Sequence, residues 1–272
     1  MPDLASIGDL MLTSLEKAEF YTLGAQEFMF ALEDLQDWTV TGAQTTNTIN
    51  GARGVPLAAI KSQKGVTGSM TNGVLSLPAL AADVGGEVAY SDSVTIRWTD
   101  IVTMTSATSA TINYTPAGGY IYLVALQNED GTIGKRFTLA EGGTPGAGQY
   151  TINTKSLTFS ADDNIPTNAK LVVKYDRSMS NAAVMTNPGD TFSKDATMIA
   201  TFIGEDKACN QYLVQATFNK VSLDGAMTWG AGDEAKTYDL AWTAYANRCS
   251  GSANQFYSIV IVSDDDVDAA EA

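Results

Sequence analysis

The sequence predicts a mainly β protein: a β-sandwich or barrel with one helix, plus a small inserted or appended β-sandwich. Charged residues make up only 17% of the 272 residues, and Thr, Ser, Asn, Ala and Gly take their place, which is typical of strands and turns with neutral polar surfaces. Short apolar runs that alternate with polar residues recur between Gly, Asn and Asp turn signals. Helical spacing of apolar residues stands out in one segment, so we expect one main helix.

The distribution of charge predicts two domains. Residues 1–95 carry a net charge of −7 and residues 179–272 carry −8, whereas residues 96–178 are neutral. We therefore expect the two outer segments to form one discontinuous acidic β domain, with residues 96–178 as an inserted β-sandwich module.

The first outer segment is expected to open with an aromatic hairpin. The runs 17–23 and 27–32 alternate and are rich in aromatic residues, with a Gly-Ala turn at 24–25. A third strand begins at Asp37. The run 41–54, TGAQTTNTINGARG, has almost no core-forming side chain, so we interpret it as a long polar loop, a kind of segment that is usually functional or disordered.

Strand character resumes at residues 64–70 and ends at an Asn-Gly turn at 72–73. Apolar residues at near-helical spacing then predict the main helix over residues 75–84. Gly85 and Gly86 are expected to end this helix, because glycine readily adopts the left-handed conformation of a helix C-cap.

Six runs in the middle segment are predicted to be strands of the inserted module, with turn signals between them. These runs are 110–114, 119–126, 133–139, 149–153, 156–159 and 170–175. The second outer segment is predicted to contain five further strands, and its acidic end, residues 263–272, is interpreted as a solvated terminus. The five strands are 197–203, 211–218, 226–229, 237–244 and 255–262.

Histidine is absent from the chain, which excludes Ser-His-Asp and Cys-His catalytic arrangements and removes the commonest metal ligand. The adjacent acid pairs at 33–34 and 233–234 are read as turns, since nothing places them across a cleft. We expect no enzymatic activity, no cofactor and no bound metal. The tail carboxylates that could ligate a cation lack the pattern of an EF-hand loop. They are Asp264, Asp265, Asp266 and Asp268.

Cys209 and Cys249 are expected to be two buried free thiols, with a disulfide left open as the alternative. The first 20 residues lack the basic and apolar regions of a signal peptide, and no apolar run is long enough to span a membrane. We therefore expect the protein to be made and assembled in a cytoplasm, without a membrane partner. The net charge of −15 argues against a monomeric protein that binds nucleic acid.

The order of these elements resembles that of bacteriophage tail tube, or major tail, proteins. The resemblance is carried by the aromatic hairpin at 17–32 and its long polar loop, by the strand, turn and helix at 64–84, and by the late strand pair at 211–229 and 234–247. Residues 149–175 look like the Ig-like or accessory β modules of virion proteins. The neutral middle insertion departs from the minimal tube subunit.

This resemblance implies a virion protein that forms rings, often hexameric, which stack into the tail tube. Its partners would be its own copies, other tail proteins and double-stranded DNA, which passes without specific binding. Duplex DNA carries one negative charge per ~1.7 Å, so an acidic lumen would repel the DNA and keep it sliding. The candidate lumen-facing acids are Glu33, Asp34, Asp37, Glu205, Asp206, Asp233 and Glu234. The candidate inter-ring loop residues are Thr41, Gln44, Asn47, Asn50 and Arg53.

Two other functions remain open from the sequence. A capsid decoration or head structural protein would bind preformed capsids without polymerising alone. A carbohydrate-binding β module would stack sugars on exposed tryptophans, for which packing in a core is the other interpretation. The tryptophans are Trp38, Trp98, Trp229 and Trp242.

Overall fold

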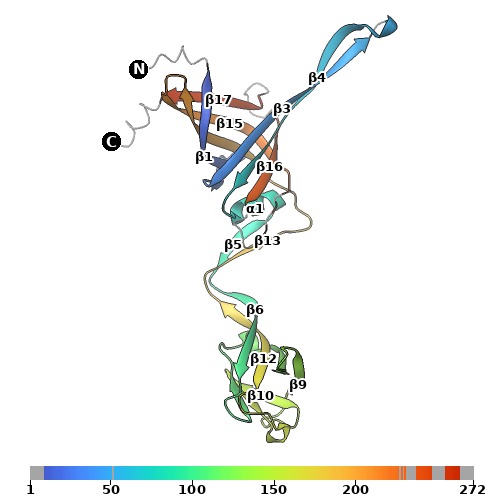
Figure 1. The fold of residues 1–272 in the computed structure, drawn as a ribbon, viewed down its shortest axis with the longest axis vertical. Helices are drawn as coiled ribbons and strands as arrows, with labels where there is room; N and C mark the ends of the chain where they lie inside the picture. Colours follow the sequence, from blue (N-terminus) through green and yellow to red (C-terminus); the bar gives the residue numbers. More distant parts are fainter. Residues whose placement is uncertain are drawn as a thin grey trace. The chain divides into compact units, whose positions relative to one another are not determined.

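The computed structural model describes residues 9–50, 52–226, 228, 230, 237–246 and 255–263 (Figure 1). The chain is mainly β, as predicted, and the described part contains one α-helix. Two compact units are formed. The host unit consists of Met1–Val88 and Met185–Ala272, and the inserted unit is Ala89–Val184.

The host unit is built on an eight-stranded sheet. Its strands are β1 (Leu10–Thr22), β2 (Phe28–Leu32), β3 (Leu35–Asn50), β4 (Pro56–Asn72), β14 (Asp195–Asp206), β15 (Gln211–Leu223), β16 (Tyr238–Ala244) and β17 (Tyr257–Ser263). Seven strands follow the order β2-β1-β14-β15-β16-β4-β3, and β17 pairs with β15. All of these pairs are antiparallel.

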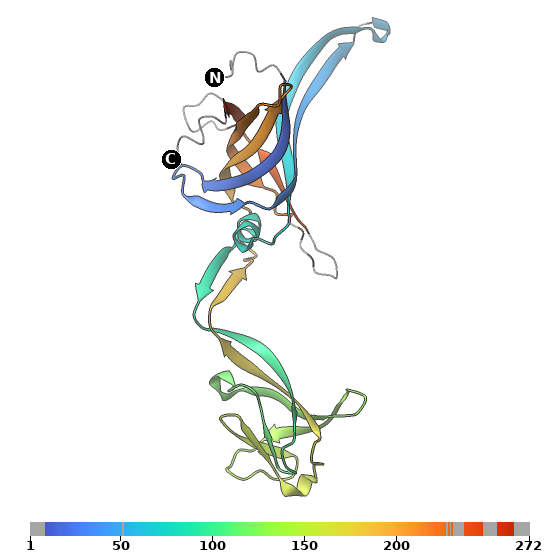
Figure 2. The same ribbon diagram turned by 60° about the vertical axis from the view of Figure 1, so that its left-hand side comes forward.

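One face of the curved host sheet carries the core (Figure 2). On β15, buried Val214, Ala216 and Phe218 alternate with more exposed residues, because successive side chains of a strand point to opposite faces. Phe20 of β1 stacks on Phe30 of β2 at a ring distance of 4.4 Å. The predicted aromatic hairpin is therefore confirmed, and its rings anchor one end of the core.

Trp242 is the largest fully buried side chain of this core. Its indole ring packs 4.8 Å from the ring of Phe218 and 5.6 Å from that of Trp38. It also covers Gly68 of β4 so closely that a Cβ atom there would lie 2.2 Å from the ring. The glycine in this strand is therefore required by the close approach of the tryptophan.

The predicted helix is confirmed as α1 (Leu77–Val84). The Ser76 side chain caps its start by accepting a hydrogen bond from the backbone N–H of Ala79 at 3.3 Å. Gly85 ends it with a φ of 72°, a conformation that glycine adopts without steric penalty. Ala79 and Ala82 of α1 join the core of the host sheet.

The inserted unit contains a second path of seven strands, β6-β12-β8-β9-β10-β11-β7. These are β6 (Val94–Thr103), β7 (Ser109–Thr111), β8 (Ile121–Gln127), β9 (Ile133–Leu139), β10 (Gln149–Asn153), β11 (Ser156–Phe159) and β12 (Lys170–Met179). The predicted hairpin of β10 and β11 is confirmed. Where the chain passes between the units, β5 (Glu87–Ser91) and β13 (Ala182–Thr186) form a two-stranded sheet.

A buried carboxylate organises the core of the inserted unit. Asp100 accepts hydrogen bonds from the Tyr175 hydroxyl at 2.7 Å, the Asn113 backbone and side-chain N–H groups at 2.8 and 3.0 Å, and the Trp98 indole at 2.9 Å. Burial raises the pKa of Asp100, but these hydrogen bonds outweigh burial, so its pKa lies below the ordinary value of 3.8. Burial and the hydrogen bond to Asp100 raise the pKa of Tyr175 above its ordinary value of 10.0.

Candidate functional site

The segment predicted to be a polar loop is a long β-hairpin, so that prediction of its conformation is wrong. Strands β3 and β4 stay paired from Leu35 and Asn72 out to Asn50 and Pro56. A short 3₁₀ turn, η2 (Ala52–Gly54), joins them. The absence of core-forming side chains does not prevent a strand here, because threonine favours extended backbone and both faces of this hairpin meet solvent.

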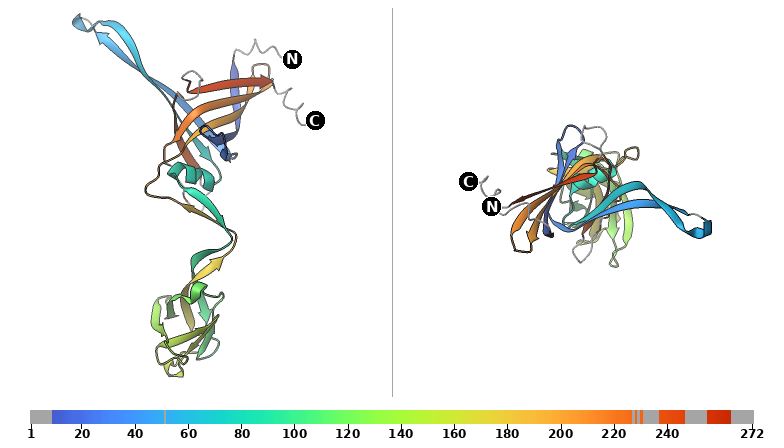
Figure 3. Two further views of the ribbon diagram at one scale, coloured as in Figure 1. Left: turned by 180° about the vertical axis from the view of Figure 1, so that it is seen from behind. Right: turned by 90° about the horizontal axis from the view of Figure 1, so that it is seen from above.

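We call residues 43–64 the arm; Figures 1 and 3 show it extending beyond the strands that surround the core of the host unit. Nearly all of its described side chains are exposed. The predicted inter-ring residues Gln44, Asn47, Asn50 and Arg53 lie on it, and Thr41 lies at its root. All five are exposed, and their contact with another ring stays a prediction.

The arm carries large apolar side chains without a covering layer. Their exposed fractions are 49% for Ile49, 58% for Val55, 71% for Leu57 and 55% for Ile60. Ile49 pairs with Ala58, and Asn47 pairs with Ile60, so Ile49, Ala58 and Ile60 share one face of the hairpin. The end of the arm therefore presents an apolar surface to its surroundings.

The arm is also basic in an acidic protein. Residues 38–82 contain no Asp or Glu, but they contain Arg53, Lys61 and Lys64. The local excess of basic residues is present in the sequence, but the net charge of −7 over residues 1–95 conceals it.

The host sheet leaves an open apolar groove of about 360 Å³ on its inner face. Phe202, Val214 and Phe218 form its buried floor. Tyr257 and Ile259 of β17 face into it, opposite Phe218 and Ala216, yet they are 43% and 56% exposed. The other lining residues are Leu12, Trp38, Val40, Gly42, Val66 and Ala216.

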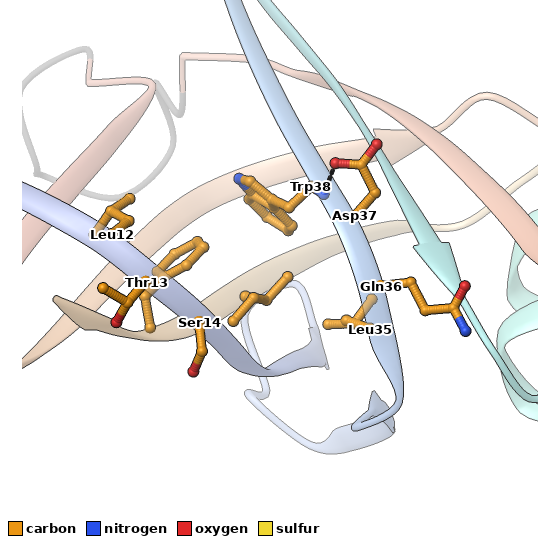
Figure 4. Close-up of a pocket in the computed structure, with 9 residues that line it drawn as sticks. Leu12, Thr13, Ser14, Leu35, Gln36, Asp37 and Trp38 are labelled. Atoms are coloured by element: carbon orange, nitrogen blue, oxygen red, sulfur yellow. Dashed lines mark hydrogen bonds between the residues drawn. The ribbon is translucent and has the colours of Figure 1, made fainter.

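Next to this groove, the first half of β1 and the start of β3 face each other across a cavity of about 480 Å³ (Figure 4). Leu12 to Leu15 line one side, and Leu35 to Trp38 line the other. No hydrogen-bonded register joins β1 to β3 in the described part of the chain. The sheet is thus not closed by main-chain hydrogen bonds at this place.

The predicted lumen acids that the structure describes form two groups, one at the start of β3 and one at the end of β14. Exposed Asp37 lines the cavity beside Leu12 to Leu15, and exposed Glu33 and Asp34 precede it in the link between β2 and β3. The second group is Glu205 and Asp206 at the end of β14, which pair with the start of β1. That these acids face a lumen stays a prediction, and Asp233 and Glu234 lie outside the described residues.

Asp206 has a structural task that its position in the sequence did not reveal. Its carboxylate accepts hydrogen bonds from the Asn210 side chain at 2.8 Å and from the backbone N–H groups of Asn210 and Ala208 at 2.9 and 2.7 Å. These hydrogen bonds lower the pKa of Asp206 below its ordinary value of 3.8, and the bond from the Asn210 side chain has the largest effect. The carboxylate therefore stabilises the turn between β14 and β15 and stays ionised.

Around this turn, acids form a rim at the end of the groove. We define the rim as Asp9, Glu205 and Asp206, which share a depression with Leu10 and Met11. Lys207 forms an ion pair with Asp9 and offsets one of the three charges. Leu12 lines the groove, and Leu10, two residues earlier on the same face of β1, lines the depression and pairs with Asp206, so rim and groove adjoin along β1.

Cys209 lies in the same turn, and its exposed thiol corrects the expectation of burial. Its φ of 64° places it in a left-handed position of the turn between β14 and β15. A hydrogen bond with Glu205 raises the pKa of this thiol. Cys249, and with it the question of a disulfide, lies outside the described residues.

The tryptophans offer little open surface to a sugar. Trp242 is fully buried, so core packing is confirmed for it, and Trp38 packs against the Phe202 ring at 5.5 Å. Trp98 in the inserted unit has the Arg177 guanidinium 5.0 Å from its ring centre. Trp229 is not among the described residues.

Within the described ranges, no three Asp, Glu or Cys side chains gather as metal ligands would. The tail acids Asp264, Asp265, Asp266 and Asp268 fall outside these ranges. None of the helices that the structure describes combines the length and apolar character needed to cross a membrane.

Comparison with known protein families matches residues 10–259 to the YomU/Tube protein family. The match extends across both the host and the inserted unit. None of the curated proteins matches the chain.

Proposed function

The chain belongs to the YomU/Tube protein family, and from that premise we propose that its copies assemble into stacked rings that form the tube of a phage tail. The family name indicates a tube-type structural protein of a phage, and hence a component of the virion. The proposed ring is a hexamer. Its partners are further copies of the chain, other tail proteins and the DNA that passes through.

The observation that carries this proposal is the arm. It is a two-stranded hairpin with apolar residues on its surface and no third strand along its length in the described structure. Such a hairpin is at best marginally stable alone in water, so it gains stability from a surface that covers it. A protruding element that fits a different surface of the next copy generates rings or open-ended polymers.

The ends of the host sheet support the same proposal. β2 and β3 terminate the path of paired strands, so each has an edge without a hydrogen-bonded neighbour among the described strands. Unpaired edges are templates for pairing with another chain. Joining the sheets of neighbouring subunits in a ring satisfies these edges and gives the tube a continuous wall.

Charge supports passage of DNA without binding. The chain has a net charge of −15, and exposed Glu33, Asp34 and Asp37 are the described acids that we assign to the lumen. An acidic wall repels the phosphate backbone, so DNA slides instead of adhering. In this role the protein performs no reaction.

The test is negative-stain electron microscopy of the concentrated protein. We expect rings or hollow tubes, and a duplex DNA fragment should neither bind to them nor nucleate them at physiological salt. Monomers alone at high concentration contradict the proposal. A chain that coats preformed capsids without polymerising would instead be a decoration protein, and a positive glycan screen would support a carbohydrate-binding module.

A further inference from the structure

We propose that the end of the arm inserts into the apolar groove of a second copy, with the bases of the arm against the acidic rim of that copy. This inference rests on the proposed self-assembly and adds the surface that receives the arm. Three observations support the inference: the exposed apolar residues of the arm, the exposed lining of the groove, and the opposite charges of the arm and the rim.

The groove of one chain cannot be filled by the arm of the same chain. Val40 and Gly42, which line the groove, are the root of the arm. Asn50 lies eight residues farther along β3, or roughly 26 Å at the ~3.3 Å rise of an extended strand. Because the paired strands lead away from the groove, the apolar end of the arm reaches a groove only on another copy.

Among the described residues, none fills the groove, although its lining is continuous with the core of the host unit. Ile259 points to the same face as buried Ala216, whereas its neighbour Val260 lies opposite Gln215 on the other face. Ile259 and Tyr257 therefore have the direction of core residues but the exposure of surface residues. Contiguous apolar surface of this kind marks a site of protein interaction.

The end of the arm matches this groove in polarity. Ile49, Ala58 and Ile60 share one face of the hairpin, whereas Leu57, next to Ala58 on β4, points to the opposite face. In the proposed contact, the face of Ile49, Ala58 and Ile60 lies against Leu12 of β1 and against Tyr257 and Ile259 of β17. Burying both surfaces removes apolar area from water and drives the association.

Charge complementarity favours another copy of this acidic chain as the partner. Arg53, Lys61 and Lys64 have no acidic residue near them along residues 38–82. The rim of Asp9, Glu205 and Asp206 remains negative after its one ion pair with Lys207. Complementary charge of this type orients an encounter and selects its register. It assigns Glu205 and Asp206 to the contact with the arm, and it leaves Glu33, Asp34 and Asp37 to the lumen.

Cross-linking between differently labelled chains tests this contact. In a background with Cys209→Ser and Cys249→Ser, one preparation carries Ala58→Cys and a second carries Ile259→Cys. The two are mixed, allowed to assemble and oxidised, and disulfide-linked dimers are measured on non-reducing gels. Because a disulfide requires Cα atoms within about 7 Å, the proposal predicts a cross-link yield at least about tenfold above that of a matched control.

The matched control replaces Ile259→Cys with Val260→Cys. The two positions are neighbours on β17 with exposed fractions of 56% and 52%, but they face opposite sides of the sheet. Equal cross-linking from both positions, or tubes without any cross-link to position 259, overturns the inference and leaves the proposed function intact. Absence of any polymer in the unmodified protein instead rejects the proposed function.

A charge placed in the groove gives a second readout. Ile259→Asp should raise the protein concentration needed for tube formation at least about tenfold, because a carboxylate would be buried among apolar side chains. Val260→Asp should change it much less. Far-ultraviolet circular dichroism verifies that both variants are folded. Normal assembly of folded Ile259→Asp overturns the inference.

Discussion

The inserted unit and the host unit bury their side chains in different ways. In the inserted unit, the buried carboxylate of Asp100 accepts four hydrogen bonds from Tyr175, Asn113 and Trp98. In the host unit, Tyr257 and Ile259 lie on the core face of the sheet but remain exposed, and the apolar residues at the end of the arm are exposed as well. In the proposed assembly, the arm and the groove of the host unit gain burial from a second copy.

Charge follows the same division. The segment that contains most of the inserted unit is neutral, and acids are concentrated in the host segments. The three bases of residues 38–82 all lie on the arm. The arm, the groove and the acidic rim, on which the proposed assembly depends, all belong to the host unit, so variants of the two units should affect assembly and stability differently.

The largest effect is expected from Trp242→Ala. Removing this fully buried ring from the core of the host unit should lower its free energy of unfolding by about 3–5 kcal/mol. Chemical denaturation followed by circular dichroism measures the loss, and Val260→Ala on the exposed face should change it by less than about 0.5 kcal/mol. A small loss at Trp242 would mean that the host core is not organised around this ring.

A second variant, Asp100→Ala, distinguishes the role of the inserted unit from that of the host unit. It leaves the donors of Tyr175, Asn113 and Trp98 buried without their acceptor, so the inserted unit should lose about 3 kcal/mol of stability. Tube formation should persist, because the arm and the groove belong to the host unit. The measurement combines thermal unfolding with electron microscopy, and exposed Glu129→Ala is the control. Loss of tubes while the host unit stays folded contradicts the division of roles.

The dependence of stability on pH should show the same network. The pKa of Asp100 is below 3.8 in the folded chain, so its contribution to stability is present above pH 3.8 and is lost as the pH falls through the folded-state pKa. The pKa of Tyr175 is raised above 10.0, so its contribution is present below pH 10.0 and is lost as the pH rises beyond that value. The melting temperature of the inserted unit should therefore be constant between these two pH values and should fall on either side of them. Asp100→Asn should weaken the acidic limb of the curve, and an unchanged limb would exclude Asp100 as its cause.

The smallest effect concerns the charges of the arm. Replacing Arg53, Lys61 and Lys64 together by Gln should raise the concentration needed for assembly only a few-fold, because exposed charges are screened by solvent and salt. The difference from the unmodified chain should shrink between low salt and about 1 M salt. Pelleting assays measure it, with Lys155→Gln in the inserted unit as control. An effect independent of salt would assign these residues a packing role.

Local signals predicted part of this fold well. The aromatic hairpin of β1 and β2 and the helix α1 follow from alternation, from the Ser76 cap and from Gly85, all of which act within a few residues. The strands of the arm were not predicted, because strand prediction relies on apolar residues that alternate with polar ones. The threonines and asparagines of β3 lack this pattern, although their backbone is extended. β6 was missed for a related reason, since Arg97, Thr99 and Asp100 interrupt its apolar pattern.

The candidate site was less accessible to sequence reasoning. The groove combines residues from β1, β3, β4, β14, β15 and β17, which are far apart along the chain and meet only in the folded sheet. A sequence also does not reveal which groups a carboxylate contacts: Asp206 was predicted as a lumen-facing acid, and its carboxylate accepts hydrogen bonds from the backbone of its own turn. The basic bias of residues 38–82, by contrast, was a signal available from the start.

The most direct test of the account is the sedimentation velocity of the intact chain over a series of rising concentrations. Self-assembly through the host unit predicts a shift from the 28.7 kDa chain to species many times heavier as the concentration increases. A single species of 28.7 kDa at every concentration would contradict the central claim.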